Sequence, residues 1–164
     1  MRLFSIVIST IILAFTLNAN EHYLLPEHQS DLLHSLKRKI ERAESMTIIT
    51  TALDHTSLSN SIEKALKKKV KLQLITTDML SAAYYSKYKS TTVKVPSSKR
   101  LTDNFHLNIL LIDRSDVCFS TLSFSDTVLN TNIGEVTCTT NSEEIAFALD
   151  IAKRFSERFK DYHQ

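Results

Sequence analysis

The sequence predicts an α/β protein with a mixed β-sheet flanked by helices. Strand-like and helical segments alternate in the first part of the chain, and a group of strands followed by one long helix completes it. The 164 residues are 43% hydrophobic and 23% charged, which suits a single domain with a buried core.

The chain begins with a strand, a helix and a second strand. Residues 22–26 are the short first strand, and residues 28–45 carry apolar side chains at the spacing of an amphipathic helix. Residues 46–52 are rich in β-branched side chains, which favour a strand. A helix follows at residues 56–69, with Ser57 as its N-cap. Its terminal lysines favour the negative end of the helix dipole, so we interpret them as a solvated helix end.

The middle of the chain continues the alternation. Residues 70–77 alternate apolar and polar side chains, as a half-buried strand does. We expect a helix at residues 79–90, a short strand at 91–96 and a loop at 97–104.

Three strands and a long helix end the chain. The strands are expected at residues 105–113, 115–123 and 134–140, and residues 114–115 form the tight connection of a hairpin. The first of these strands, FHLNILLID, is mostly apolar, so we expect it at the centre of the sheet. Residues 142–163 form the final helix, acidic at its start and basic near its end.

Residues 1–19 have the layout of a secretory signal peptide. Arg2 precedes an apolar stretch from Leu3 to Leu17, and Ala19 is the expected last residue before cleavage. An uncleaved N-terminal anchor remains the alternative, because the stretch is near the short limit for a membrane span. In either case we expect an exported protein, periplasmic or anchored and facing the periplasm, with its domain in residues 20–164.

Composition limits the chemistry of this domain. Gly134 is the only glycine, which excludes glycine-rich phosphate loops, and no metal-ligand spacing is present. We therefore expect no cofactor and no metal. A net charge of +2 does not demand nucleic acid or an anionic membrane as a partner.

In an exported domain Cys118 and Cys138 either form a disulfide or remain two buried thiols, and the sequence leaves both open.

A polar pair interrupts the start of the apolar strand FHLNILLID. His106 and Asn108 are two residues apart, so they are expected on the same face of the strand, and Asp113 follows at its end. The next strand leads into the turn STLSFS, residues 120–125, and Glu135 opens the strand after it.

This pattern resembles the phospholipase D superfamily, especially its small single-domain bacterial endonuclease-like members. Their signature is H-x-K-x-x-x-x-D on a strand, followed by a G-S-x-N-[FW]-[ST] turn and a glutamate. The helix–strand–helix–strand order upstream is similar as well, so the resemblance extends over nearly the whole chain after residue 19 and implies the same fold.

The resemblance assigns a role to each matching residue. His106 is the implied nucleophile that attacks a phosphodiester phosphorus, and a second histidine, from a symmetry-related copy, protonates the leaving alkoxide and later activates water. Thr121 and Ser123 occupy turn positions that hydrogen-bond the substrate. Glu135 is implied to hold the imidazole in the required tautomer, and Asp113 completes the motif.

The motif also departs from the family pattern. Asn108 occupies the lysine position, and a neutral amide cannot supply the charge that stabilises the transition state. Loss of one such group typically costs on the order of 100- to 1000-fold in rate. Ser120 replaces the glycine of the turn and Ser123 replaces its asparagine. Lys99 or Arg100, in the preceding loop, is a candidate replacement for the missing charge.

Two functions remain open from the sequence. The first is a degenerate phosphodiesterase with weak or lost turnover that still binds a phosphodiester, in a nucleic acid or a phospholipid head group. The alternative is an active hydrolase, a phosphodiesterase or endonuclease, with one histidine from each subunit of a homodimer. His55 follows the second strand, at the sheet edge where this family builds its cleft, so it is a further candidate.

Overall fold

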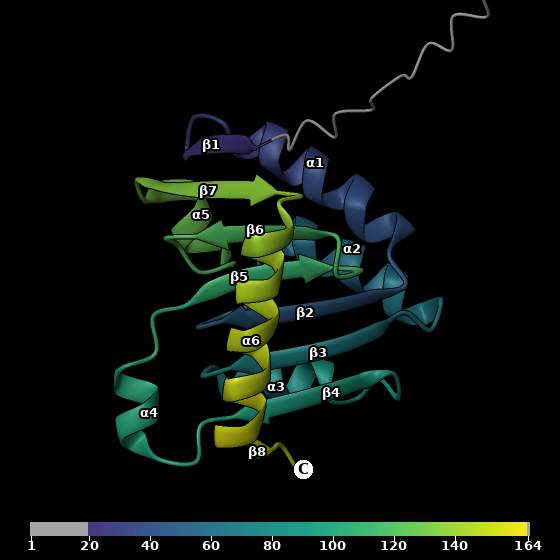
Figure 1. Ribbon diagram of the computed structural model, residues 1–164, viewed down its shortest axis with the longest axis vertical. Coiled ribbons are helices and arrows are strands. Elements are labelled where there is room, and N and C mark those ends of the chain that lie inside the picture. The colour runs from purple at the N-terminus through teal and green to yellow at the C-terminus, as the bar shows by residue number, and fades with distance from the viewer. Residues whose placement is uncertain (1–19, 164) are drawn as a thin grey trace, which may run out of the picture.

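The computed structural model describes residues 20–163, and the predicted signal peptide or anchor at residues 1–19 lies outside them. The described chain forms one eight-stranded sheet in the order β1-β7-β6-β5-β2-β3-β4-β8 (Figure 1). The strands are β1 (Glu21–Leu25), β2 (Ser45–Thr50), β3 (Lys71–Thr76), β4 (Thr91–Val95), β5 (Asn108–Ile112), β6 (Asp116–Ser120), β7 (Gly134–Thr139) and β8 (Lys160–Asp161). The helices are α1 (Gln29–Arg42), α2 (Thr56–Lys67), α3 (Met79–Tyr85), α4 (Lys99–Asp103), α5 (Asp126–Thr131) and α6 (Ser142–Arg158).

The sheet is mixed, and the strand FHLNILLID is central, as predicted. Strands β2, β3 and β4 are parallel to one another, whereas β5 is antiparallel to both β2 and β6. All five residues of β5 are buried. The strand begins only at Asn108, so His106 lies in the connection before it.

Helices cover both faces of the sheet. Figure 1 shows α6 crossing one face, with α1, α2 and α3 behind the sheet. Leu110 and Ile112 of β5 belong to the core with α1 and α2, whereas Ile109 and Leu111 belong to the core with α6. The two faces of β5 therefore supply both halves of the hydrophobic core.

Several element boundaries differ from those predicted. A short helix, α4, lies within the expected loop at residues 97–104, because the Ser98 side chain accepts a hydrogen bond from the Leu101 N–H and caps it. The N-cap of α2 is His55 instead of Ser57. The expected helix at residues 79–90 already ends at Tyr85.

The end of the chain shows further differences. Helix α5 lies between β6 and β7, in a segment for which the sequence predicted no element. The last helix ends at Arg158, and residues after it form β8, which pairs with β4 through Lys94 and Asp161. The C-terminus is thereby held against the edge of the sheet. No helix within residues 20–163 is long and apolar enough to cross a membrane.

Cys118 and Cys138 form a disulfide, which decides between the two possibilities left open by the sequence. They are directly opposite each other in the register of β6 and β7, and both are almost completely buried. The bond links residues 20 apart in sequence.

Reduction of this disulfide should lower the free energy of unfolding by about 3 kcal/mol, because the bond restricts a loop of 20 residues in the unfolded chain. Urea unfolding with and without a reductant measures the difference. The Cys118→Ala/Cys138→Ala double variant is the control and should not respond to the reductant. Equal stability of the oxidised and reduced wild-type protein would contradict the prediction.

Candidate functional site

The residues of the motif meet at one edge of the sheet, which we call the site edge. It comprises the end of β2 at Thr50, the start of β5 at Asn108 and the turn at residues 120–125 after β6. The antiparallel pairing of β5 with β2 and with β6 brings these three segments together, since Ile49 pairs with Ile109 and Ser120 pairs with Asn108.

His106 is exposed at the site edge. It lies between α4 and β5, two residues before the strand, and it makes no hydrogen bond or ion pair within residues 20–163. The adjacent Phe105 is buried against Phe155 and Phe159, which anchors the backbone beside the imidazole. The packing of Phe105 thus holds the backbone at His106 in place. The imidazole itself remains free, as the side chain of a nucleophile must be.

Asn108 is buried, whereas His106 is exposed in the connection before β5, so the two do not share one face of a strand as predicted. Asn108 is 6% exposed, and its Oδ1 lies 2.9 Å from the Thr50 hydroxyl and 3.3 Å from the Thr51 backbone nitrogen. The Thr50 hydroxyl in turn lies 2.9 Å from the Ala52 carbonyl oxygen. Asn108 therefore fixes the end of β2 through buried hydrogen bonds, and its carbonyl oxygen is already satisfied by donors.

The turn at residues 120–125 is tied to both of its neighbours. The Ser120 hydroxyl donates to the Leu122 carbonyl oxygen, and the Phe124 N–H approaches the Thr50 hydroxyl, the same group that contacts Asn108. The Thr121 hydroxyl accepts from the Glu135 backbone N–H at 2.9 Å. This bond gives Thr121 a structural role in the turn.

Ser123 and Ser125 end the turn differently. The Ser125 side chain caps α5 by accepting from the Val128 N–H, and it is buried. Ser123 is half-buried, and within residues 20–163 its hydroxyl makes a hydrogen bond only with that of Ser125, at 3.4 Å. Ser123 is therefore the turn residue whose side chain remains most available to a ligand.

Glu135 does not hold the His106 imidazole, and that prediction is wrong. Its carboxylate contacts His22 Nδ1 at 3.3 Å and accepts from the Thr137 hydroxyl at 3.2 Å. The register explains the difference. Val136 pairs with Ser120, which pairs with Asn108, so Val136 shares the face of Asn108 and Glu135 points to the opposite face.

Gly134 occupies the neighbouring position of β7 that does face the turn. A Cβ atom built there would lie 2.4 Å from Leu122 Cγ and 2.8 Å from the Thr121 hydroxyl oxygen. A carboxylate at this position would need Leu122 to move. The strand therefore presents no acidic side chain toward the turn beside Asn108.

Asp113 also lies away from the site, contrary to its assignment to the catalytic group. It follows the far end of β5, so the whole strand separates it from His106. Its Oδ1 accepts from the backbone N–H groups of Glu44 and Ser45, at 2.8 and 2.7 Å. Asp113 thus joins the β5–β6 turn to the start of β2, and its role is structural.

His55 lies at the site edge but is 4% exposed. Its Nε2 lies 3.4 Å from Asp126 Oδ1 and 3.4 Å from the Gln29 side-chain nitrogen. The Thr56 hydroxyl donates to Asp126 and, as the largest cause, lowers the pKa of that carboxyl below its usual value. His55 joins the starts of α1, α2 and α5, a role in folding that leaves it inaccessible to a substrate.

A cavity of about 560 Å³ also opens at this edge. It is lined by Thr51, Asp54, Asp78 and Tyr84, among others. The carboxylate of Asp78 accepts hydrogen bonds from the backbone of α3, but that of Asp54 makes none within residues 20–163. The cavity has no cationic lining residue, so it does not replace the charge that a lysine at position 108 would supply.

No metal site accompanies these residues. Within residues 20–163, no group of three His, Cys, Asp or Glu side chains is arranged to hold a metal ion.

Comparison with known proteins identifies the fold. No family model matches the sequence, and neither does any curated protein. Solved structures do match, and they include members of the phospholipase D family. The chain has the phospholipase D fold, as the resemblance implied.

Three of these structures illustrate the likeness. NucT from Helicobacter pylori has a TM-score of 0.78 at 22% identity, over 88% of this chain and 99% of that one. Nuc from Salmonella typhimurium, a phospholipase D family member, has a TM-score of 0.73 at 15% identity, over 90% and 99% of the two chains. The phosphatidylserine synthase of Haemophilus influenzae Rd KW20 has a TM-score of 0.70 at 9% identity, over 90% of this chain and 40% of that one.

The sequence alone did not indicate the part played by Thr50. This threonine connects Asn108 to the turn at residues 120–125, but it is one of several threonines near the end of a strand. Only the pairing of β5 with β2 shows which of them lies beside the motif.

We expect Asp113→Ala to lower the free energy of unfolding by about 1–3 kcal/mol, because two backbone N–H groups lose their acceptor. Chemical denaturation measures the effect. Arg114→Ala is a matched control: Arg114 also has a positive φ, 57° against 50° for Asp113, but its side chain makes no hydrogen bond or ion pair within residues 20–163. Equal losses in the two variants would contradict the structural role of Asp113.

Proposed function

We propose that this protein is an exported phospholipase D-like protein that binds a phosphodiester and has weak or lost turnover. The observation that carries the proposal is the state of Asn108. In the position where the family has a cation, a buried amide directs its oxygen to Thr50 and Thr51. Such a site keeps a nucleophile at His106 but lacks the charge that stabilises the phosphorane-like transition state.

A second feature supports the same conclusion. Glu135 faces away from the motif, and Gly134 beside it leaves no room for a side chain. The imidazole of His106 therefore has no carboxylate partner within residues 20–163 to fix its tautomer or to stabilise its charged form. Both losses reduce catalysis more than binding, because they remove groups whose main effect is in the transition state.

Other residues retain the ability to bind a phosphodiester. Ser123 and His106 remain available as donors at the site edge. The ligand class is a nucleic acid or a phospholipid head group, which share the phosphodiester. The disulfide between Cys118 and Cys138 supports the proposal of export, because such bonds persist in oxidising compartments.

We expect Asn108→Lys to increase hydrolysis, by up to about 100-fold, because it restores the missing cation. Hydrolysis of single-stranded DNA and of a generic phosphodiester ester measures the change. Thermal unfolding should accompany the assay, because the substitution also removes the buried bonds to Thr50 and Thr51.

His106→Ala provides the matched control for both backgrounds. It should abolish whatever hydrolysis the wild type and Asn108→Lys show. Robust wild-type turnover that His106→Ala removes would contradict the proposal and favour the active hydrolase. In that case Lys99→Ala and Arg100→Ala would test whether α4 supplies the cation, since both side chains are exposed on that helix.

Assembly offers a separate prediction. The chain holds one copy of the histidine motif, so a two-histidine mechanism needs a second chain related by a twofold axis. We propose a homodimer through the site edge, where His106 is exposed and the turn at residues 120–125 carries no formal charge. Light scattering at micromolar concentration should give twice the chain mass, whereas a monomer would exclude both the dimer and the shared site.

A further inference from the structure

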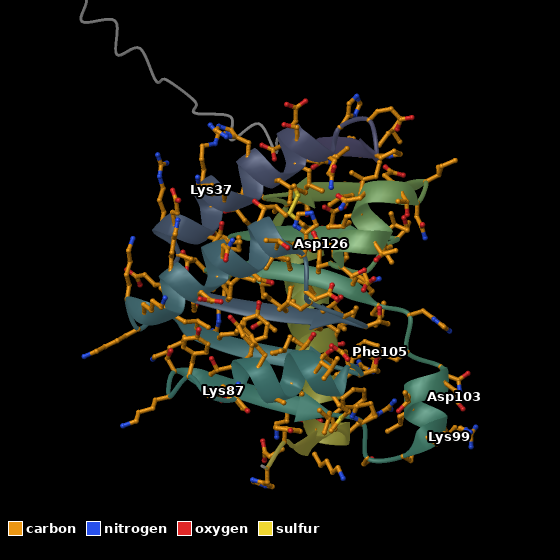
Figure 2. All side chains as sticks on the ribbon, turned by 180° about the vertical axis from the view of Figure 1, so that it is seen from behind. Lys37, Lys87, Lys99, Asp103, Phe105 and Asp126 are labelled. Atoms are coloured by element: carbon orange, nitrogen blue, oxygen red, sulfur yellow. A yellow bond between two sulfur atoms is a disulfide. The ribbon has the colours of Figure 1, made fainter. Side chains whose placement is uncertain are left out.

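The edge of the sheet opposite the site edge is strongly basic. Helices α1 and α2 end there, because they run antiparallel to the parallel strands that follow them, and the β5–β6 turn lies there as well (Figure 1). Figure 2 shows Lys37 and Lys87 on this side of the molecule, with Phe105, Lys99 and Asp103 on the other. From their positions in these elements and the loops that follow them, the exposed cations of this basic edge are Lys37, Arg38, Arg42, Lys67, Lys68, Lys69, Lys71, Lys87, Lys89 and Arg114.

Most of this charge is not neutralised. Glu21 and Asp116 both pair with Lys39, and Glu63 pairs with Lys67. The carboxylate of Asp113 accepts from backbone N–H groups. Apart from Lys39, Lys67 and Lys94, the basic residues here make no ion pair within residues 20–163. The exposed carboxylates nearby are Glu41, Glu44, Asp113 and Asp161.

Helix dipoles explain only part of this arrangement. A cation in the last turn of a helix stabilises it, and Arg42 and Lys67 are such residues. The effect is confined to that turn. Lys71 lies in β3, Lys89 lies between α3 and β4, and Arg114 lies in the β5–β6 turn, so their common location needs another reason.

Two cavities open at this edge, and the larger one is suited to anionic head groups. The larger, of about 650 Å³, is lined by hydroxyl groups and by the cations Lys71, Lys89, Arg114 and Lys153. Its carboxylates are already engaged, since Asp161 pairs with Lys94, another lining residue, at 2.8 Å. The second, of about 320 Å³, lies beside α1 and is lined by three cations, Arg38, Lys39 and Arg42, and by three carboxylates, Glu21, Asp113 and Asp116, so it carries no clear excess of positive charge.

The chain also enters the fold at this edge. Glu21 begins β1 and lines the second cavity, and β1 runs from there toward the site edge. Asn20, the first described residue, therefore lies at the basic edge, where β1 begins.

We propose that the basic edge docks on an anionic lipid bilayer and presents the site edge to the surrounding medium. Lipid phosphates fit cavities lined by lysine, arginine and hydroxyl groups, and cations near such a surface are attracted individually. A nucleic acid fits the larger cavity less well, because none of its lining residues is an aromatic side chain on which bases could stack.

Vesicle flotation of the full chain tests this orientation. We compare vesicles of phosphatidylcholine alone with vesicles of phosphatidylcholine and phosphatidylglycerol. The wild type should bind the anionic vesicles more tightly, and high salt should remove the difference. The triple variant Lys68→Glu/Lys71→Glu/Lys89→Glu should weaken binding to anionic vesicles by on the order of 100-fold, since each cation contributes about fivefold. Its binding to neutral vesicles should be unchanged.

The control variant carries the same charge change at the other edge. In Lys99→Glu/Arg100→Glu/Lys160→Glu, two residues lie on α4 and the third pairs with Val95 at the end of β4. This variant should keep the preference for anionic vesicles. Equal losses in both triple variants would overturn the proposal, because net charge alone would then explain binding.

A second measurement separates membrane from nucleic acid. Amine-reactive labelling of the wild-type chain on anionic vesicles, with peptide mass spectrometry, should show Lys68, Lys71 and Lys89 protected relative to Lys99 and Lys160. Uniform labelling would overturn the orientation.

Loss of binding to a fluorescent single-stranded oligonucleotide in the basic-edge variant, with vesicle binding unchanged, would assign the edge to nucleic acid instead. None of these readouts depends on hydrolysis. The membrane proposal can therefore fail while the proposed function holds, and the proposed function can fail while the membrane proposal holds.

Discussion

The complete burial of β5 is the constraint on which the rest of the structure depends. All five of its residues are buried, with alternate side chains in the core under α1 and α2 and in the core under α6. A shift of one residue would move each set of side chains, with Asn108 among them, from its own core into the other one. The register of β5 is therefore strongly specified. Because β5 pairs with both β2 and β6, its register also decides which residues meet at the site edge.

That constraint explains which parts of the fold the sequence could predict. The apolar run of residues 109–112 is typical of a strand buried on both faces, so its central position followed from pattern alone. Helix α1 was equally clear from its apolar spacing. Helices α4 and α5 were missed because they are short, and serine caps at Ser98 and Ser125 define them better than any apolar stripe does.

The site was less predictable, for a physical reason. A motif aligned by spacing shows which residue types are present, but in a strand one position changes the face to which a side chain points. Glu135 has the expected chemistry and lies one residue away from the position that faces the turn, where Gly134 stands. Asn108 was recognised as a lost charge, but its burial against Thr50 depends on the pairing of β2 with β5, which no local pattern encodes.

The disulfide has a consequence for how the site can move. Cys118 precedes the turn at residues 120–125, and Cys138 follows Gly134, so the bond closes a covalent loop that contains the turn, the whole of α5 and the start of β7. Local opening in this part of the chain cannot separate β6 from β7, because their strands are joined at the buried register pair. In hydrogen-exchange terms, the turn and α5 can fray as a small unit, whereas the strands that hold them should exchange only with the global unfolding of the domain.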